Sequence, residues 1–447
     1  MTRNMTQGDE WKTIRNFSLP LMGASLLQTL YSFVDSVIVG NFVGKTAFGA
    51  IGLLASSIML VNMFCSSLGN GVSIVTAQFV GAERQRDVQE TVLTSQLLSL
   101  LVSAVVVGLC LLGSRPLIVG FLGTPEDMQV FSLQYFRIYS VGLLFQFAYQ
   151  VCYGILRAHG DSKGALLFLL VGGIFNVLLD LLFVIVFRME VVGAALATII
   201  AQAGSAIACI LYLYRHYPAC RLFGQKTPLW HPGKAGLIGR ISVPILCQTS
   251  VLSLGFIVLQ RLVNSFGAAS IEGFAAEQKV ESFIHIVPGG LNSAMSSFTG
   301  QNIGAGKTDR IRRGFFKTAG AGFLFSAATA LLMIAFGHRF LSVFQISEEG
   351  LARGYAHLVV LVIFMLPQSV YTIGAGLLQG AGDVKITALA SFLNLFLRVS
   401  GAYLMASTWI SYRSLWWSLP LAWSANFLII ILRYRSGRWE SKSLVTK

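Results

Sequence analysis

The sequence contains twelve long, mostly apolar stretches separated by shorter polar connections. About twenty apolar residues are enough for a helix to cross a hydrocarbon layer about 30 Å thick. Only 12% of the residues are charged, about half the share of a soluble chain. We therefore expect an all-α polytopic membrane protein with twelve transmembrane helices, at 14–38, 48–78, 91–113, 131–156, 164–187, 191–214, 237–264, 270–300, 315–337, 354–379, 385–408 and 414–432.

The positive charges are distributed unevenly between the connections. Most Lys and Arg lie at the two ends of the chain and in even-numbered connections such as 215–240 and 307–317. Basic connections of membrane proteins stay on the cytoplasmic side, so both termini are expected to be cytoplasmic. This orienting role accounts for the net charge of +14 without a nucleic-acid partner. A cleaved signal peptide is not expected, because the first apolar run is of full length.

Several motifs occur twice at a nearly constant spacing. TAQFVGAERQRD at 76–87 matches TGQNIGAGKTDR at 299–310, and GILRAHGDSK at 154–163 matches GLLQGAGDVK at 376–385. Pro20 and Pro244 also correspond. The chain therefore consists of two copies of a six-span unit.

The repeat predicts two pseudo-symmetric six-helix lobes, at 1–217 and 237–447, joined by a polar linker at 218–236. Because six spans are an even number, both copies insert with the same orientation. Parallel repeats of this kind are typical of transporters that bind their substrate between two halves.

The segment GAGKT at 304–308 is similar to part of a phosphate-binding loop. Such a loop needs a further glycine at position 301, where this chain has a glutamine. The matching segment of the first repeat, GAERQ, cannot bind phosphate in this way. We expect both segments to end helices through their glycines, and no nucleotide is expected as a ligand.

Acidic residues within the predicted spans are candidate functional residues, because a carboxylate near the membrane centre costs roughly 2.5–3.5 kcal/mol. Asp35 shares one helix face with Gln28 and Tyr31, at spacing i, i+3, i+7. Asp180 follows Asn176 by one turn in the fifth span.

If these faces converge with Thr198 of the sixth span, they form a site of carboxylate, amide and hydroxyl groups. Two carboxylates in such a site cannot both remain ionised cheaply, so the site favours uptake of a proton or a sodium ion. A cationic substrate could compete with that ion, which would make the protein an antiporter. The alternative is that Asp35 and Asp180 are structural and pair with arginines within the spans: Arg137, Arg261 or Arg398.

The second repeat has no acid at either position, and Arg398 lies where the first repeat has Asp180. Its eighth span carries charged and titratable residues instead, among them Glu277, Lys279, Glu281 and His285. The two acids and the histidine share a helix face and could line the cavity or pair with arginines across helices. We expect a structural ion pair for Lys279, whereas both roles stay open for Glu281.

Together these features resemble the multidrug and toxic compound extrusion (MATE) family, close to its DinF-like branch. The resemblance covers nearly the whole chain and rests on LPLMGASLLQTLYSFVDSVIVG at 19–40, the paired loops, and FNVLLDLLF followed by GAALAT. It implies a V-shaped transporter of the inner (cytoplasmic) membrane. Such a protein is a secondary active multidrug antiporter that exports cationic or lipophilic organic compounds in exchange for protons or sodium by alternating access.

By the same resemblance, the cation-coupling site, which could hold sodium, comprises Asp35, Asn176, Asp180 and Thr198. Pro20 is expected to bend the first span. The residues expected to line the substrate cavity are Gln28, Tyr31, Tyr139, Gln150, Tyr153 and Glu281. No enzymatic activity and no cofactor other than the coupling ion are expected.

Related proteins raise the questions of a second acidic site and of an alternative function. The NorM-like branch has an acid in the seventh span, near the position of Leu252 in this chain, so a second acidic site there is not expected. A flippase for lipid-linked saccharides, from the same superfamily, is the alternative function, and the intramembrane bases Arg261, Lys279 and Arg398 favour it. The protein is expected to act as a monomer.

Overall fold

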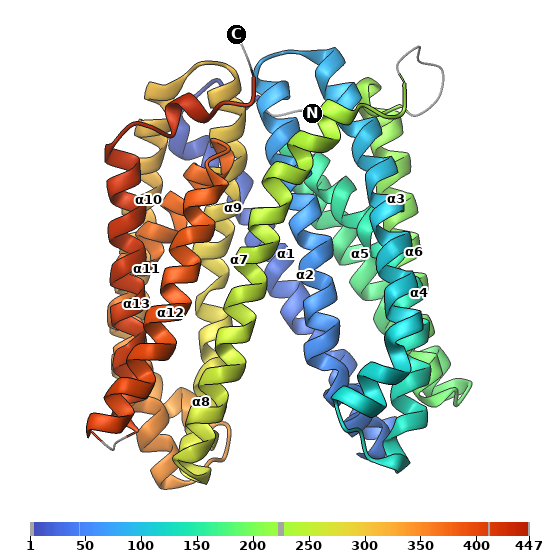
Figure 1. The fold of residues 1–447 in the computed structure, drawn as a ribbon, viewed down its shortest axis with the longest axis vertical. Helices are drawn as coiled ribbons and strands as arrows, with labels where there is room; N and C mark the ends of the chain where they lie inside the picture. The colour runs from blue at the N-terminus through green and yellow to red at the C-terminus, as the bar shows by residue number, and fades with distance from the viewer. Residues whose placement is uncertain (1–3, 44, 222–227, 410–411, 446–447) are drawn as a thin grey trace. The chain divides into compact units, whose positions relative to one another are not determined.

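The computed structural model describes residues 4–43, 45–221, 228–409 and 412–445, and for some residues within helices, 31–37 among them, it describes the backbone alone. The described residues form helices and no strands. The long helices, shown in Figure 1, are α1 (Glu10–Phe42), α2 (Lys45–Gly81), α3 (Gln85–Arg115), α4 (Glu126–Ala158), α5 (Ser162–Asp180), α6 (Glu190–His216), α7 (Pro232–Ser265), α8 (Ala268–Ile284), α9 (Ile286–Gly304), α10 (Thr308–Ser342), α11 (Glu348–Gly380), α12 (Val384–Trp409) and α13 (Arg413–Arg435). Two short π-helices extend α3 and α5: η1 (Pro116–Phe121) and η2 (Leu181–Val186). Two short 3₁₀-helices complete the described chain: η3 (Pro218–Cys220) and η4 (Glu440–Lys442).

Within the described residues, ten helices are long and apolar enough to cross a membrane. The other two predicted spans correspond to α1 and to the pair α8 and α9. Together α8 and α9 cover the predicted eighth span at 270–300, with a break at His285. Pro288 explains the break, since it has no N–H to donate to the carbonyl of Ile284.

Contacts divide the chain into two compact units. Apart from the first four residues, unit 1 is Gly23–Leu246, and unit 2 is Met5–Met22 together with Cys247–Lys447. Two helices, α1 and α7, therefore begin in one unit and continue in the other. Each passes between the units two residues after a proline, Pro20 in α1 and Pro244 in α7.

The helices pack in the same way within both units. In unit 1, α4 contacts α2, α3 and α6, and α5 lies against α6. In unit 2, α11 contacts α8, α9, α10 and α13, and α12 lies against α13. The central helices α4 and α11 are the equivalent spans of the two repeats, so the sequence repeat is also a repeat of packing.

Two equivalent glycines allow the central helix to approach its neighbour closely. A β-carbon on Gly154 of α4 would lie 2.3 Å from the backbone oxygen of Gly69 in α2. In the second repeat, a β-carbon on Gly376 of α11 would lie 2.4 Å from the backbone oxygen of Asn292 in α9. Small residues at such contacts are the usual basis of helix packing in membranes.

The paired motifs GAERQ and GAGKT end α2 and α9 with the same hydrogen-bonding pattern. The N–H of Arg84 after α2 and that of Lys307 after α9 each donate to a carbonyl five residues earlier, at 3.1 and 2.8 Å. The preceding residues, Glu83 (φ 58°) and Gly306 (φ 70°), are left-handed, as in a Schellman C-cap. The prediction that GAGKT terminates a helix is confirmed.

The Gly-Asp pairs of the repeated motifs GILRAHGDSK and GLLQGAGDVK lie just after the central helices α4 and α11. The side chains that bind the two aspartates differ between the repeats. Asp161 caps the N-terminus of α5 and accepts hydrogen bonds from Tyr212 (2.9 Å) and Tyr217 (3.1 Å). Asp383, at the equivalent place, pairs with Arg433 of α13 at 2.6 Å. Both repeats therefore have an aspartate at this position, but it is bound by tyrosines in the first repeat and by an arginine in the second.

Helix α3 illustrates how the polar and apolar faces are arranged. Its buried face carries Ser95, Ser99 and Ser103, and each hydroxyl donates to a carbonyl of the preceding turn. Its large apolar side chains point outward: Leu100, Leu101, Val105, Leu109 and Leu112 are exposed. Apolar residues outside and satisfied polar residues inside are what a hydrocarbon solvent requires.

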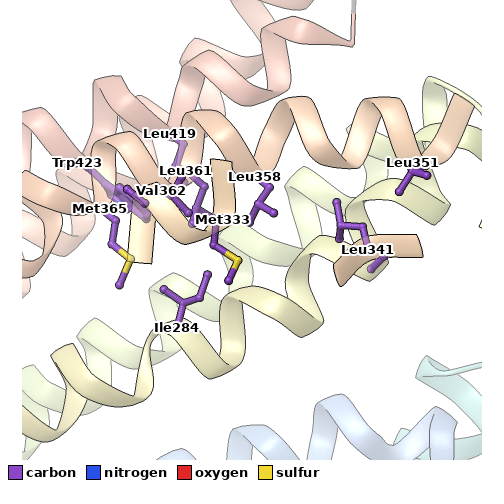
Figure 2. Close-up of a cluster of buried hydrophobic side chains, with 12 residues drawn as sticks. Ile284, Met333, Leu341, Leu351, Leu358, Leu361, Val362, Met365, Leu419 and Trp423 are labelled. Atoms are coloured by element: carbon purple, nitrogen blue, oxygen red, sulfur yellow. The ribbon is translucent and has the colours of Figure 1, made fainter. Parts of the chain in front are cut away.

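The apolar core of unit 2 is formed where α8, α10, α11 and α13 meet, and Figure 2 shows its side chains. The residues labelled there are Ile284, Met333, Leu341, Leu351, Leu358, Leu361, Val362, Met365, Leu419 and Trp423. This core fixes α8 against α11, the two helices that carry the buried charges described below.

Candidate functional site

The strongest candidate site residues of unit 1 lie on α5. Asp180 is completely buried and Asn176, one turn earlier, is 5% exposed. Ile174, Phe175 and Leu178 of the same helix are exposed. An apolar helix therefore directs its amide and its carboxyl inward, as expected for functional polar groups within a membrane.

The amide of Asn176 has capacity for a ligand. The side-chain nitrogen of Asn176 has no hydrogen-bond partner among the described residues. The π-helix η2 begins directly after Asp180, and such wide turns occur frequently at functional sites. Asn176 and Asp180 lie together on one buried face, as the spacing predicts.

The other two members of the predicted cation site are less fully defined. Thr198 is half-buried on α6, which packs against α5, and its hydroxyl donates to the carbonyl of Ala194 at 3.0 Å. That hydroxyl oxygen retains lone pairs for a cation. The side chains of Asp35 and Tyr31 lie outside the described residues, so their part in the site stays a prediction.

A second polar cluster joins α2 and α4. The amide of Asn62 donates to the hydroxyl of Tyr139 at 3.0 Å, and Gln146 donates to the Asn62 oxygen at 3.4 Å. Tyr139 also stacks on Tyr135, with ring centroids 6.0 Å apart. Asn62 was not predicted as a site residue, although a single amide within an apolar span was a usable signal.

The remaining cavity candidates of unit 1 have varied surroundings. Gln150 and Tyr153 are half-buried on α4, and Gln28 is exposed on α1. The guanidinium of Arg157 lies 5.6 Å from the ring centre of Tyr153 and donates to Asn70 at 2.9 Å. Tyr153 therefore belongs to a cation–π pair close to the end of α4.

Unit 2 contains a buried group of charged side chains between α8 and α11. Glu277 is completely buried and its carboxylate lies 3.0 Å from Nδ1 of His357, which is 2% exposed. One turn along α8, Glu281 lies 3.1 Å from Nε2 of His285. The guanidinium of Arg398, on α12, interacts electrostatically with both carboxylates.

These contacts bear on the two roles that the sequence leaves open for the acids of α8, lining the cavity or pairing with arginines. The electrostatic interaction of Arg398 with Glu277 and Glu281 favours pairing with an arginine across helices. Lys279 is exposed and has no ion pair with any described residue, so the structural ion pair expected for it is not found. The sequence analysis missed His357, whose only signal was a single histidine in an apolar span.

Aromatic rings enclose these charges. His357 stacks on Trp416 with centroids 4.2 Å apart, and Phe274 lies 5.7 Å from the His357 ring. His285 meets the edge of Trp423 at 6.3 Å.

Among the described residues, no cluster of three or more His, Cys, Asp or Glu side chains could hold a metal ion. A sodium ion takes other oxygen ligands as well, such as the carboxylate, amide and hydroxyl groups of Asp180, Asn176 and Thr198. The side chains of these three residues carry oxygens of the kind that hard cations bind.

Comparison with known proteins relates this arrangement to one family. The MatE family matches residues 20–182 and again residues 244–404, once in each repeat. The chain is 27% identical over 446 residues to the probable multidrug resistance protein YpnP of Bacillus subtilis (strain 168), covering 99% of both chains. It is 25% identical to the probable multidrug resistance protein YoeA of the same organism, covering 99% of this chain and 97% of the relative.

The fold is also similar to that of solved transporters. A MOP superfamily transporter from Pyrococcus furiosus Vc1 (DSM3638) superposes with a TM-score of 0.88, at 21% identity and over 100% of both chains.

Two repeats of membrane-spanning helices with polar groups turned inward define a multi-pass membrane transporter rather than an enzyme. The chain belongs to the MatE family, the multidrug and toxic compound extrusion transporters.

Proposed function

We propose that the protein is a secondary active multidrug antiporter that exports cationic or lipophilic organic compounds in exchange for protons or sodium. Its coupling site comprises Asp35, Asn176, Asp180 and Thr198. The coupling ion and the substrate bind there in alternation, and the protein alternates between access from the two sides of the membrane. A proton moving down a potential of about 100 mV releases about 2.3 kcal/mol, which can drive such a cycle.

The observation that carries this proposal is the complete burial of Asp180 beside Asn176 on a helix whose outer face is apolar. A carboxyl group at that place is costly, so it favours a function that uses its charge. The names of the two Bacillus relatives, both probable multidrug resistance proteins, support organic compounds as cargo. The basic even-numbered connections support an inner-membrane protein with both termini in the cytoplasm.

The decisive experiment measures ethidium efflux from proteoliposomes under an imposed proton gradient and, separately, an imposed sodium gradient. The variants are Asp35→Asn and Asp180→Asn, each of which removes one charge with little change of shape. Asp127→Asn is the matched control, since Asp127 is an exposed acid at the start of α4.

We expect one gradient to drive efflux by the parent and the control, and both site variants to lose at least about 90% of it. Parent-like efflux by both site variants at equal incorporation would refute the coupling site. Flipping of a lipid-linked saccharide in the same vesicles, without ethidium efflux, would instead identify the alternative flippase.

A further inference from the structure

The first described residues of the chain are held by side chains of unit 2. The N–H of Met5 donates to Gln301 at 2.9 Å, and its carbonyl accepts from Asn302 at 3.1 Å. Lys307 donates to the carbonyl of Thr6, and Arg310 to those of Met5, Gln7 and Gly8. We call the surface that holds Met5–Glu10 the N-terminal docking site. Its residues are Gln301, Asn302, Lys307, Arg310, Arg313 and Lys317.

Opposite charges complete this site at the start of α1. Glu10, 7% exposed, lies 3.0 Å from Arg313, 2.7 Å from Lys317 and 3.6 Å from Arg310. Asp9 lies 3.0 Å from Lys317. The segment that leads into α1 is therefore acidic, and the surface that binds it is basic.

The start of α7 is held in unit 1 by a second surface, which we call the α7 docking site: Phe79, Asp87, Glu90 and Thr94. The ammonium of Lys234 forms an ion pair with Asp87, lies 3.9 Å from Glu90, and lies 3.9 Å above the ring of Phe79. The N–H of His231 donates to Thr94 at 3.2 Å. Here the leading segment is basic and the surface is acidic.

The two sites occupy equivalent positions in the repeats with their charges reversed. The tenth residue before Pro20 is Glu10, and the tenth before Pro244 is Lys234. The receiving residues correspond as well. Those of the first repeat are Asp87 and Glu90, eleven and fourteen residues after Thr76, and those of the second are Arg310 and Arg313, at the same distances after Thr299.

We propose that these surfaces are two docking sites of opposite charge, each selective for the leading segment of the other repeat, and that both stay occupied throughout transport. Selectivity follows from repulsion: Glu10 on the α7 docking site would face Asp87 and Glu90. A segment so fixed cannot follow the unit in which its helix continues. Movement of one unit relative to the other is then absorbed within α1 and α7, just after Pro20 and Pro244.

Charge reversal tests the selectivity. In Glu10→Lys, the leading segment meets like charges, and we expect amide hydrogen exchange of residues 5–17 to rise about tenfold through local opening. Adding Asp9→Lys, Arg313→Glu and Lys317→Glu restores opposite charges at both acidic positions and should return exchange to within about twofold of the parent. Glu348→Lys, at an exposed acid of α11, is the control and should leave the segment unchanged.

A covalent link tests whether the N-terminal docking site stays occupied. Asp9→Cys and Lys317→Cys are joined by a short reducible bifunctional thiol reagent in a chain with Cys110→Ala and Cys247→Ala, because the other four cysteines are buried. We expect the linked protein to retain more than about half of its ethidium efflux. Loss of efflux on linking, with recovery on reduction, would show that the segment must leave and would overturn the proposal.

The linking experiment rests on the proposed transport function, whereas the exchange experiment does not. If the parent exports no organic compound, the proposed function fails while the exchange data still decide whether docking is selective. Rapid exchange in both the single and the quadruple variant, or no change in Glu10→Lys, would refute the charge selectivity of the two docking sites regardless of transport.

Discussion

Glu10 is an acid that basic side chains nearly enclose, and its ionisation is part of how the N-terminal segment is fixed. Hydrogen bonding from Lys317, and then from Arg313, lowers the pKa of Glu10 from 4.5 to about 2. Hydrogen bonds from the backbone N–H of Lys12, and then from the ammonium of Lys317, lower the pKa of Asp9. Because the pKa of Glu10 is lower in the folded protein, its contribution is present above pH 4.5 and is lost as the pH falls from there towards 2.

We therefore predict acid release of the N-terminal segment. A spin label on Gln7→Cys, an exposed position, should be immobile at pH 5 and above and become mobile as the pH falls from 4.5 towards 2. In the additional variant Glu10→Gln this transition should become much smaller, since of the two acids beside Lys317 only Asp9 remains to titrate. Electron paramagnetic resonance spectra measure this directly, and a transition above pH 5 would contradict the assignment to Glu10.

Glu277 and His357 form the most deeply buried contact between a carboxylate and a basic side chain found among the described residues. Removal of one member of a buried pair leaves the other without compensation, at a cost of about 3–5 kcal/mol. We predict that Glu277→Ala and His357→Ala each destabilise the protein by about this amount, and that the double variant costs much less than their sum.

Unfolding in detergent, followed by circular dichroism, gives the three free energies. Glu348→Ala, at an exposed acid, is the control and should change the free energy of unfolding by less than about 0.5 kcal/mol. Additive effects of Glu277→Ala and His357→Ala would mean that the two side chains do not depend on each other.

At the scale of elements, the two repeats are most alike where the backbones of neighbouring helices are in contact. Gly154 of α4 and Gly376 of α11 approach their neighbouring helices so closely that a β-carbon would overlap a backbone oxygen. A backbone carbonyl in a helix cannot move aside as a flexible side chain can. The two contacts should therefore be destabilised to a similar extent by an added methyl group.

We predict that Gly154→Ala and Gly376→Ala each destabilise the protein by about 1–3 kcal/mol, as overpacking does. Gly108→Ala of α3 is the matched control, since no atom lies within 4 Å of its added β-carbon. Thermal unfolding monitored by size-exclusion chromatography ranks the three variants. Equal midpoints for all three would show that α4 and α11 can shift away from their neighbours.

At the scale of the whole molecule, the charge distribution predicts how the chain is oriented. Basic even-numbered connections should lie in the cytoplasm and odd-numbered ones outside. A membrane-impermeant maleimide should label Gln345→Cys, in the connection between α10 and α11, in intact cells. It should label Arg438→Cys, beyond α13, only after lysis. Both positions are exposed, and the reverse labelling pattern would refute the orientation.

The sequence alone determined the features that depend on local chemistry. Apolar runs of membrane length predicted the long helices, because each helix satisfies its own backbone hydrogen bonds in lipid. The recurrence of GAERQ as GAGKT predicted two equivalent helix ends, because a left-handed C-cap depends on a few consecutive residues. The spacing of Asn176 and Asp180 likewise predicted that they share a face of α5.

Tertiary structure alone decided which distant residues meet. No sequence pattern indicated that Asn62 binds Tyr139, that Glu277 faces His357, or that Met5–Glu10 docks on unit 2. Each pairing depends on how separate helices pack, and apolar helices in lipid can pack in many ways with similar burial of apolar surface. The choice among them is made by close glycine contacts and by matched charges, which act only once the helices are side by side.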